Sequence, residues 1–200
     1  LMTNLSSSIV NTLFNFQFMH FAGEDGVAAY GTLMYVNFIF VAIFLGYSIG
    51  SAPIVSYHYG ARNSEELKNL LTKSLKMIGV WGVALFALAQ LIASPLARIF
   101  VGYDPNLFDL TRHGFRIFCL AFLVNGFNIY GSSFFTALNN GLLSALISFL
   151  RTLVFQIASV LLLPMIFGID GIWGAVFVAE ILTLCVTIIC LAKKQKVYHY

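Results

Sequence analysis

Charged residues are scarce in this sequence. Asp, Glu, Lys and Arg make up 10% of its 200 residues, whereas they supply about 25% of a typical soluble domain. The net charge of +3 is small and the basic residues are scattered along the chain, so the sequence lacks the concentrated positive surface that nucleic-acid binding requires. These deficits exclude an ordinary soluble domain and a nucleic-acid partner.

Cysteine is also rare, and its placement excludes the usual cysteine-based sites. Cys119, Cys185 and Cys190 each fall inside an apolar run, with no CxxC pair and no Cys/His cluster. Such positions are typical of small core residues rather than of disulfides or metal ligands. We therefore predict no metal site.

Catalytic motifs are missing as well. The sequence has no glycine-rich phosphate loop with Lys, no HExxH, no paired carboxylates at mid-span and no Ser/His/Asp set with credible geometry. We predict that the chain is not an enzyme, binds no cofactor and does not use ATP directly. Its start, Leu1-Met2-Thr3, has no basic leader or cleavage site, so we expect no signal peptide and interpret the chain as a fragment of a longer protein.

Apolar residues, in contrast, dominate the sequence: 60% of residues are hydrophobic, and the mean hydropathy is +0.88. Six apolar runs each approach the ~20 residues that a helix needs to cross a bilayer. We predict an all-α polytopic membrane protein, a single six-helix bundle over residues 1–200, with helices at about 1–22, 27–59, 65–93, 105–138, 141–165 and 169–192. A β-barrel is excluded because the runs are too long and do not alternate.

Turn-forming residues separate these runs. The segments 23–26 (GEDG), 139–141 (NNG) and 168–171 (GIDG) each predict a tight turn. Ser94-Pro95 and 102–105 (GYDP) are expected to bracket a short interfacial segment. The remaining connection, after residue 59, is short and basic.

The basic residues predict the orientation. An even number of spans puts both termini on one side, and that side carries most of the positive charge, at Arg62, Lys68, Lys73, Lys76, Lys193, Lys194 and Lys196. Because cytoplasmic loops carry an excess of Lys and Arg, we predict that both ends and the 60–76 loop are cytoplasmic.

Several motifs resemble those of one transporter family. Residues Pro53 to Ala61 read Pro-x-x-Ser-x-x-x-Gly-Ala and precede a charged helix start. Later motifs are FFTALNNG at 134–141, SFLRTL at 148–153, LP at 163–164, GIDGIW at 168–173 and AE at 179–180. In order, spacing and loop length they resemble helices seven to twelve of bacterial MATE (multidrug and toxic compound extrusion) transporters, over nearly the whole chain.

The resemblance implies the C-terminal lobe of a twelve-helix antiporter of the bacterial inner membrane, whose N-terminal six-helix lobe is missing here. It implies export of amphipathic, often cationic organic compounds in exchange for Na⁺ or H⁺, by rocking of two lobes about a central cleft. Two alternatives stay open: a lipid-linked precursor flippase or polysaccharide exporter of the same superfamily, and a non-transporting membrane subunit.

Polar residues recur at intervals of three and four along the first and fourth predicted helices, which places them on one face of each helix. The first stripe is Asn4, Ser8, Asn11 and Asn15, broadened by Gln17, and the second is Asn125, Asn128, Ser132 and Thr136. Such groups either hold helices together or line a wet cavity. We predict a substrate-cavity lining of six residues: Asn11, Asn15, Gln17, Asn125, Asn128 and Ser132.

The resemblance adds an expectation about two of these helices. It implies that the first helix here lines the central cleft, and that sodium-coupled NorM-type members carry an Asp in helix ten, where this chain has Asn125. An amide oxygen coordinates sodium but exchanges no proton, so this lobe departs from that pattern.

Glu180 is the only acidic residue deep inside a predicted span, about 15 Å from either end at helical rise. An ionised carboxylate at that depth must be paired, or be in contact with water. Arg151 lies about as deep in the preceding helix and could reach it. Three interpretations stay open: a Glu180–Arg151 ion pair that locks the last two helices, a proton- or cation-coupling role, and an unpaired acid that faces the cavity.

Overall fold

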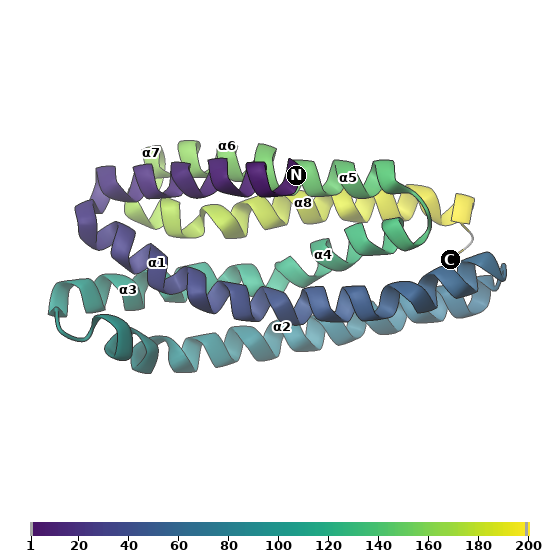
Figure 1. Ribbon diagram of the computed structural model, residues 1–200, viewed down its shortest axis with the longest axis horizontal. Helices are drawn as coiled ribbons and strands as arrows, with labels where there is room; N and C mark the ends of the chain where they lie inside the picture. Colours follow the sequence, from purple (N-terminus) through teal and green to yellow (C-terminus); the bar gives the residue numbers. More distant parts are fainter. Residues whose placement is uncertain (1, 199) are drawn as a thin grey trace.

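The computed structural model describes residues 2–198 and 200, and it describes no side chain at residues 2–5 and 196. The predictions for Asn4 and Lys196 therefore lie outside the described side chains. The described residues form helices joined by short turns and include no strand, which confirms the all-α fold class. Figure 1 shows the helices running side by side along the long axis of the molecule.

The helical elements of the described residues are α1 (Met2–Gly60), α2 (Ser64–Val101), α3 (Pro105–Phe118), the 3₁₀ turn η1 (Cys119–Ala121), α4 (Phe122–Ala137), α5 (Gly141–Phe149), the π-helical segment η2 (Leu150–Phe155), α6 (Gln156–Leu162), α7 (Pro164–Phe167) and α8 (Ile169–Tyr198). Several of them continue one another without a turn. α3, η1 and α4 form one rod, and α5, η2, α6 and α7 form another.

Five stretches of the described chain are long and apolar enough to cross a membrane: 6–60, 64–101, 105–137, 141–167 and 169–195. The first is interrupted at Gly23, whose φ of 63° and ψ of −149° are not helical. When its two halves are counted separately, they and the other four stretches make six passes. The chain is therefore a multi-pass membrane protein. Large apolar side chains are exposed along these passes, Phe16, Phe38 and Leu91 among them, as contact with lipid requires.

Two connections differ from the sequence prediction. Gly23 alone breaks α1, because residues 24–26 continue in helical geometry instead of forming a four-residue turn. The interfacial segment expected after Pro95 is part of α2, which continues to Val101. Proline removes one N–H from the ladder, but Ala93, Ala97 and Val101 are buried on one face and their packing keeps this end helical.

The connections lie at two opposite ends of the molecule (Figure 1). One end holds the α1–α2 turn, the α4–α5 turn and the end of α8, where the Asn140 side-chain amide donates to Tyr198 Oη at 2.6 Å. The other end holds the Gly23 break, the 102–104 connection and the α7–α8 turn. Arg62, Lys193 and Lys194 are therefore grouped at the first end.

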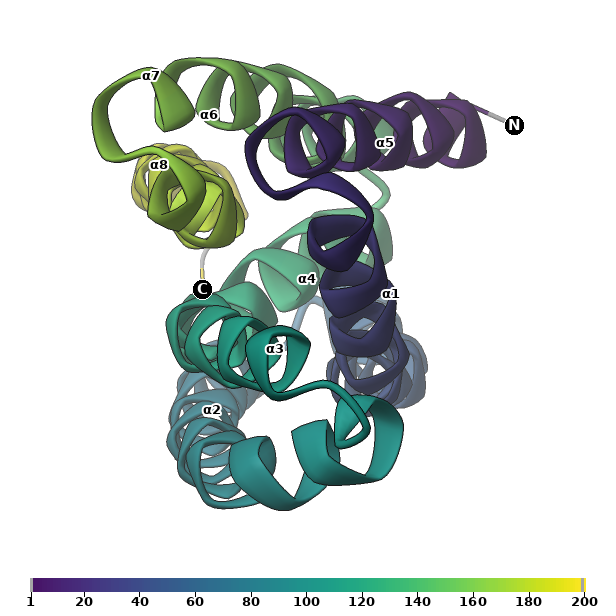
Figure 2. The ribbon, with the colours of Figure 1, turned by 90° about the vertical axis from the view of Figure 1, so that its left-hand side faces the viewer.

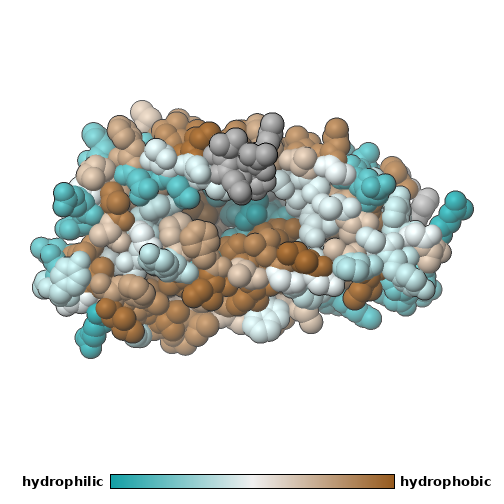
Figure 3. All heavy atoms as spheres, viewed as in Figure 1, coloured by the Kyte–Doolittle hydropathy of each residue, from teal (hydrophilic) through white to brown (hydrophobic). Residues whose placement is uncertain are grey.

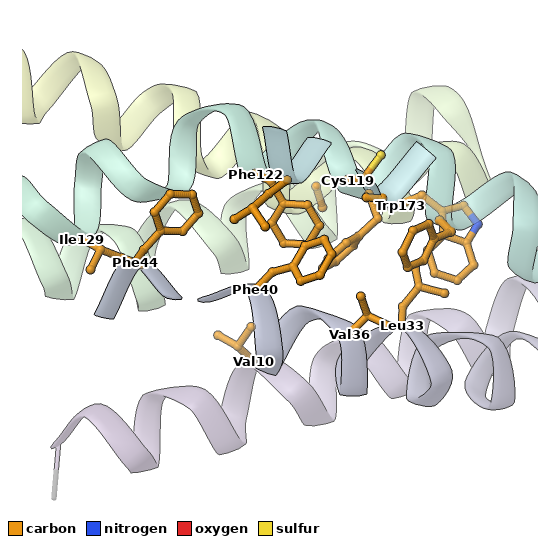
Figure 4. Packing of buried hydrophobic residues seen from close by; sticks show 14 of the residues in the cluster. Val10, Leu33, Val36, Phe40, Phe44, Cys119, Phe122, Ile129 and Trp173 are labelled. Carbon is orange, nitrogen blue, oxygen red and sulfur yellow. The ribbon is translucent and has the colours of Figure 1, made fainter. Parts of the chain in front are cut away.

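The break at Gly23 divides α1 between two groups of helices. In the end-on view of Figure 2, the first half of α1 lies beside α6, whereas its second half lies among α2, α3 and α4. The buried core lies across the break: the ring centroid of Phe18, in the first half, is 5.1 Å from that of Tyr30 in the second half and 4.2 Å from that of Trp173 on α8. Figure 4 shows Phe40, Phe122 and Trp173 in this core.

Candidate functional site

Glu180, on α8, is the acidic residue at the centre of the site. It is 1% exposed, and its Oε1 lies 2.8 Å from both Nε and Nη2 of Arg151 on η2. The structure thus joins the two residues whose depths matched in the sequence. A buried ion pair recovers the cost of leaving water only when its remaining hydrogen-bonding groups are satisfied, which directs attention to the other neighbours of the pair.

Two asparagines of α4 complete the hydrogen bonding of the pair. Arg151 Nη2 donates to Asn125 Oδ1 at 2.5 Å. The Asn128 amide donates to Glu180 Oε2 at 2.7 Å and to the Glu180 backbone carbonyl at 2.8 Å, and its own oxygen accepts from Thr187 Oγ1 at 3.0 Å. Both carboxylate oxygens of Glu180 therefore have partners, and three separate segments are tied together.

This arrangement corrects the prediction for Asn125 and Asn128. The two residues are 3% and 0% exposed, so they lie inside the lobe and do not line an open cavity. The physical reason is the central position of α4, which packs against α1, α2, α5 and α8. A stripe on such a helix faces other helices, and the amides here serve the ion pair.

Ser132, the sixth predicted lining residue, belongs to a cluster of hydroxyl groups. Its Oγ lies 2.9 Å from Oγ of Ser144 and 2.9 Å from Oγ of Ser148, both on α5. Thr136 Oγ1 donates to Ser144 Oγ at 2.7 Å. The cluster links α4 to α5 along the half of the span that ends at the 138–140 turn.

A cavity of about 310 Å³ lies beside this cluster, between α1, α4, α5 and η2. Its polar lining is Ser48, Ser132, Ser133, Thr136, Ser148, Arg151 and Thr152, and its apolar lining is Leu45, Ile49 and Ile129. Figure 3 shows a hollow with hydrophilic residues at its base in the middle of a largely hydrophobic face. Sequence reasoning missed Ser144, Ser148 and Thr152, although their four-residue spacing marks one helix face.

The three predicted lining residues of the first pass lie apart from the ion pair. Asn11 and Asn15 are exposed on the first half of α1, and Gln17 is half-buried. Asn11 Oδ1 accepts a hydrogen bond from Tyr30 Oη at 3.0 Å. No contact between the described residues brings these three side chains to Glu180 or Arg151.

Among the described residues, no group of three His, Cys, Asp or Glu side chains is placed to hold a metal ion. In the part of the chain that the structure describes, the one buried acid, Glu180, is bonded to a guanidinium and an amide, so it does not lie free beside a nucleophile. The site consists of a neutralised buried charge pair, a hydroxyl cluster and an open cavity.

Comparison with known proteins shows which family and which structures the chain is similar to. The model of the MatE family matches residues 1–162. The chain is 24% identical over 183 residues to "Probable multidrug resistance protein YoeA" of Bacillus subtilis (strain 168). This alignment covers 88% of this chain and 38% of that protein. The chain thus spans well under half the length of this curated relative.

Solved structures agree on the fold. A multidrug resistance MATE family transporter of the MOP superfamily matches in its outward-facing and its inward-facing conformations, each with a TM-score of 0.90 and 20% identity over 98% of this chain and 44% and 46% of those chains. A MOP superfamily transporter from Pyrococcus furiosus also matches at 0.90, with 20% identity over 100% of this chain and 45% of that one. At this identity the likeness concerns the fold.

Proposed function

This chain belongs to the MatE family, and we propose that it forms one six-helix lobe of a secondary active multidrug exporter. The observation that carries the proposal is its equal likeness to outward-facing and inward-facing transporter structures, at a TM-score of 0.90 in each case. If one lobe fits both conformations, the two differ mainly in how the lobes are placed. Such a lobe moves as a unit, and access alternates by rocking.

A second six-helix lobe completes the transporter. The chain covers 44% to 46% of the solved transporters, which leaves room for a partner of similar size. Following the motif order, we assign this chain to helices seven to twelve, the C-terminal lobe. The grouping of Arg62, Lys193 and Lys194 at one end supports a cytoplasmic location for that end in a bacterial inner membrane.

The first half of α1 supplies a wall of the cleft between the lobes. Asn11 and Asn15 are exposed in an otherwise apolar pass, and a polar side chain within a bilayer is stable only against protein or water. The missing lobe and the cleft provide both. Gln17 is half-buried and does not share the helix face of Asn15, and we propose that it lines the edge of the same cleft.

The exporter carries amphipathic organic compounds, including cations, in exchange for Na⁺ or H⁺, and needs no cofactor. Within this lobe we assign Glu180 a structural role, because its carboxylate is paired with Arg151 and this pair joins η2 to α8. Asn125 has no proton to exchange. The coupling carboxylate then belongs to the other lobe.

Transport in liposomes tests the proposal. The intact protein that contains this chain is reconstituted, and efflux of a fluorescent cation such as ethidium is followed under an imposed Na⁺ or H⁺ gradient. We expect a gradient to accelerate efflux several-fold, and replacement of Asn11 and Asn15 by Leu to slow it while Met19→Leu on the same half-helix does not. Absence of gradient-dependent flux with either ion would favour the non-transporting subunit.

A further inference from the structure

The cavity beside Arg151 has a lining that selects for one sign of charge. Its polar groups are hydroxyls and one guanidinium, and none of the described residues that line it is Asp or Glu. Hydroxyls donate and accept, whereas a guanidinium only donates. The lining therefore suits a ligand group that accepts hydrogen bonds.

The ion pair is oriented so that its positive end meets the cavity. Glu180 is 1% exposed and does not line the cavity, whereas the Arg151 side chain is 19% exposed and does. The contacts described for Arg151 use Nε and Nη2, and Nη1 carries two further N–H groups. A cation in the cavity thus meets the guanidinium before the carboxylate.

Ser48 is a second, independent feature of this site. The residue is 2% exposed and lines the cavity, yet its Oγ has no hydrogen-bond partner in the described structure. Buried polar groups in folded proteins are almost always paired. An unpaired hydroxyl beside a cavity is accounted for by a ligand atom that pairs with it.

We propose that this cavity binds the acidic end of an amphiphile, a carboxylate or phosphate, with the apolar part of the molecule against Leu45, Ile49 and Ile129. Arg151 and Ser48 donate to the acid, and Thr152 lies within the same lining. The inference deepens the proposed function by naming an acidic class of substrate beside the cations. It rests on the proposed function only where it treats the ligand as a transported substrate. Binding itself is measured without transport.

Binding is tested with two six-carbon amphiphiles of opposite charge, hexyl phosphate and hexylammonium. The intact protein is placed in nanodiscs of phosphatidylcholine, and the rise in Tm with ligand concentration gives the affinity. We expect hexyl phosphate to raise Tm at concentrations where hexylammonium does not. Equal stabilisation by both, or by neither, would overturn the proposal.

Two variants separate the site from its surroundings. Ser48→Ala removes one hydroxyl with little change of shape, and we expect it to weaken hexyl phosphate binding by about tenfold, the usual effect of losing one hydrogen bond to a charged group. Ser51→Ala is the matched control, since Ser51 Oγ bonds to the Ser48 carbonyl and does not line the cavity. Unchanged affinity in the Ser48→Ala variant would refute the assignment.

Ser48→Ala has a readout that a purely structural hydroxyl would not give. Because the hydroxyl is unpaired in the described structure, its removal should leave the ligand-free Tm unchanged or higher while the ligand-bound shift falls. A fall in the ligand-free Tm with an unchanged shift would mean that the hydroxyl serves folding alone.

The source of the acid is distinguished by two further arms. Nanodiscs that contain phosphatidylglycerol compete with hexyl phosphate if lipid headgroups fill the cavity, whereas a transported substrate shows gradient-dependent flux in the liposomes used for ethidium. Binding without flux of hexyl phosphate, while ethidium moves, would reject the substrate assignment. Loss of ethidium flux with binding intact would reject the transport function and leave the site standing.

Discussion

Glu180 is held in the interior of the lobe by partners on two other segments. Arg151 neutralises its charge, and Asn128 binds the second carboxylate oxygen and the backbone carbonyl of the same residue. Removing one member of a buried ion pair costs far more than removing both, since the remaining charge is left buried without a partner. The energetic role of the pair can therefore be measured by single and double replacement.

We predict that Glu180→Gln lowers the free energy of unfolding by about 3–5 kcal/mol. The double variant R151M/E180Q, which leaves no charge behind, should recover most of that loss. Thermal unfolding of each purified variant in detergent measures this loss, and the amount of each variant in the membrane provides a second measurement.

The control for this prediction is Asp170→Asn on the same helix. Asp170 Oδ1 lies 2.8 Å from His113 Nε2, but the side chains are 50% and 57% exposed, and exposed pairs contribute about 0–1 kcal/mol. A double variant as unstable as Glu180→Gln would show that the site needs these polar groups for more than neutrality.

The sequence contained part of this site. The matching depths of Arg151 and Glu180 indicated that the two could meet, because rise per residue fixes how far each lies from a helix end. Which neighbours the Asn125 and Asn128 side chains face could not be predicted in the same way. A spacing of three identifies a helix face, but the neighbour opposite that face is set by tertiary packing.

At the scale of elements, the contact between α3 and α8 depends on a residue without a side chain. A Cβ placed on Gly114 would lie 2.6 Å from Cδ2 of the Trp173 ring, and Trp173 is fully buried. A fully buried indole can move aside only by displacing its packed neighbours. The two helices approach each other as closely as they do because Gly114 faces the ring.

We predict that Gly114→Ala destabilises the protein by about 1–3 kcal/mol through overpacking. Gly174→Ala, on the α8 side of the same region, is the matched control, because its nearest new contact would be Ile117 Cγ2 at 3.9 Å. Since alanine favours a helix over glycine, the control should be neutral or stabilising in the same thermal unfolding assay. Equal losses in the two variants would contradict the close contact.

The break in α1 depends on backbone conformation alone. At φ 63° and ψ −149°, Gly23 is at the edge of a region that is essentially restricted to glycine, although a Cβ there would meet nothing within 4 Å. We predict that Gly23→Ala costs about 1–3 kcal/mol. Gly46→Ala, in the same helix and also with open space around it, should not destabilise. Calorimetry of both variants is the measurement. A loss of stability in Gly23→Ala alone indicates backbone strain, because neither new Cβ has a neighbour to clash with.

Local sequence signals explain some element boundaries and not others. Asn63 caps α2 by accepting from the Glu66 N–H, and Asp104 caps α3 by accepting from Asn106 and Leu107; both positions follow from capping preferences. The π-helical segment η2 had no such signal. It contains Arg151, and π-helical turns are common where a side chain must reach a functional contact, here Glu180.

At the scale of the whole molecule, hydropathy was enough to obtain the fold class. Runs of about 20 apolar residues and an absence of alternation define membrane helices almost by themselves, and the family match then follows from motif order. The packing partner of each face lay beyond this information. An exposed Asn15 and an exposed Phe16 look alike in an isolated lobe, although they differ in what should cover them.

We predict that Asn15 faces water in the assembled transporter and Phe16 faces lipid. Asn15→Cys should then react with a membrane-impermeant thiol reagent in intact protein, whereas Phe16→Cys, at a position that is 69% exposed in this lobe, should react at least tenfold more slowly because thiolates do not form in hydrocarbon. The assay is the rate of labelling in a background without the native cysteines. Slow labelling at both positions would mean that the amide only holds two helices together.

The single residue at which α1 changes direction limits how the two passes on either side of it can be displaced. One residue offers two soft dihedral angles, whereas the 102–104 connection, three residues long, offers six. The first pass lies with α6, and the second with α2, α3 and α4. Because Gly23 is the only residue between the two passes that leaves helical geometry, neither pass can tilt far without the other, so this connection favours rotation of both groups as one body.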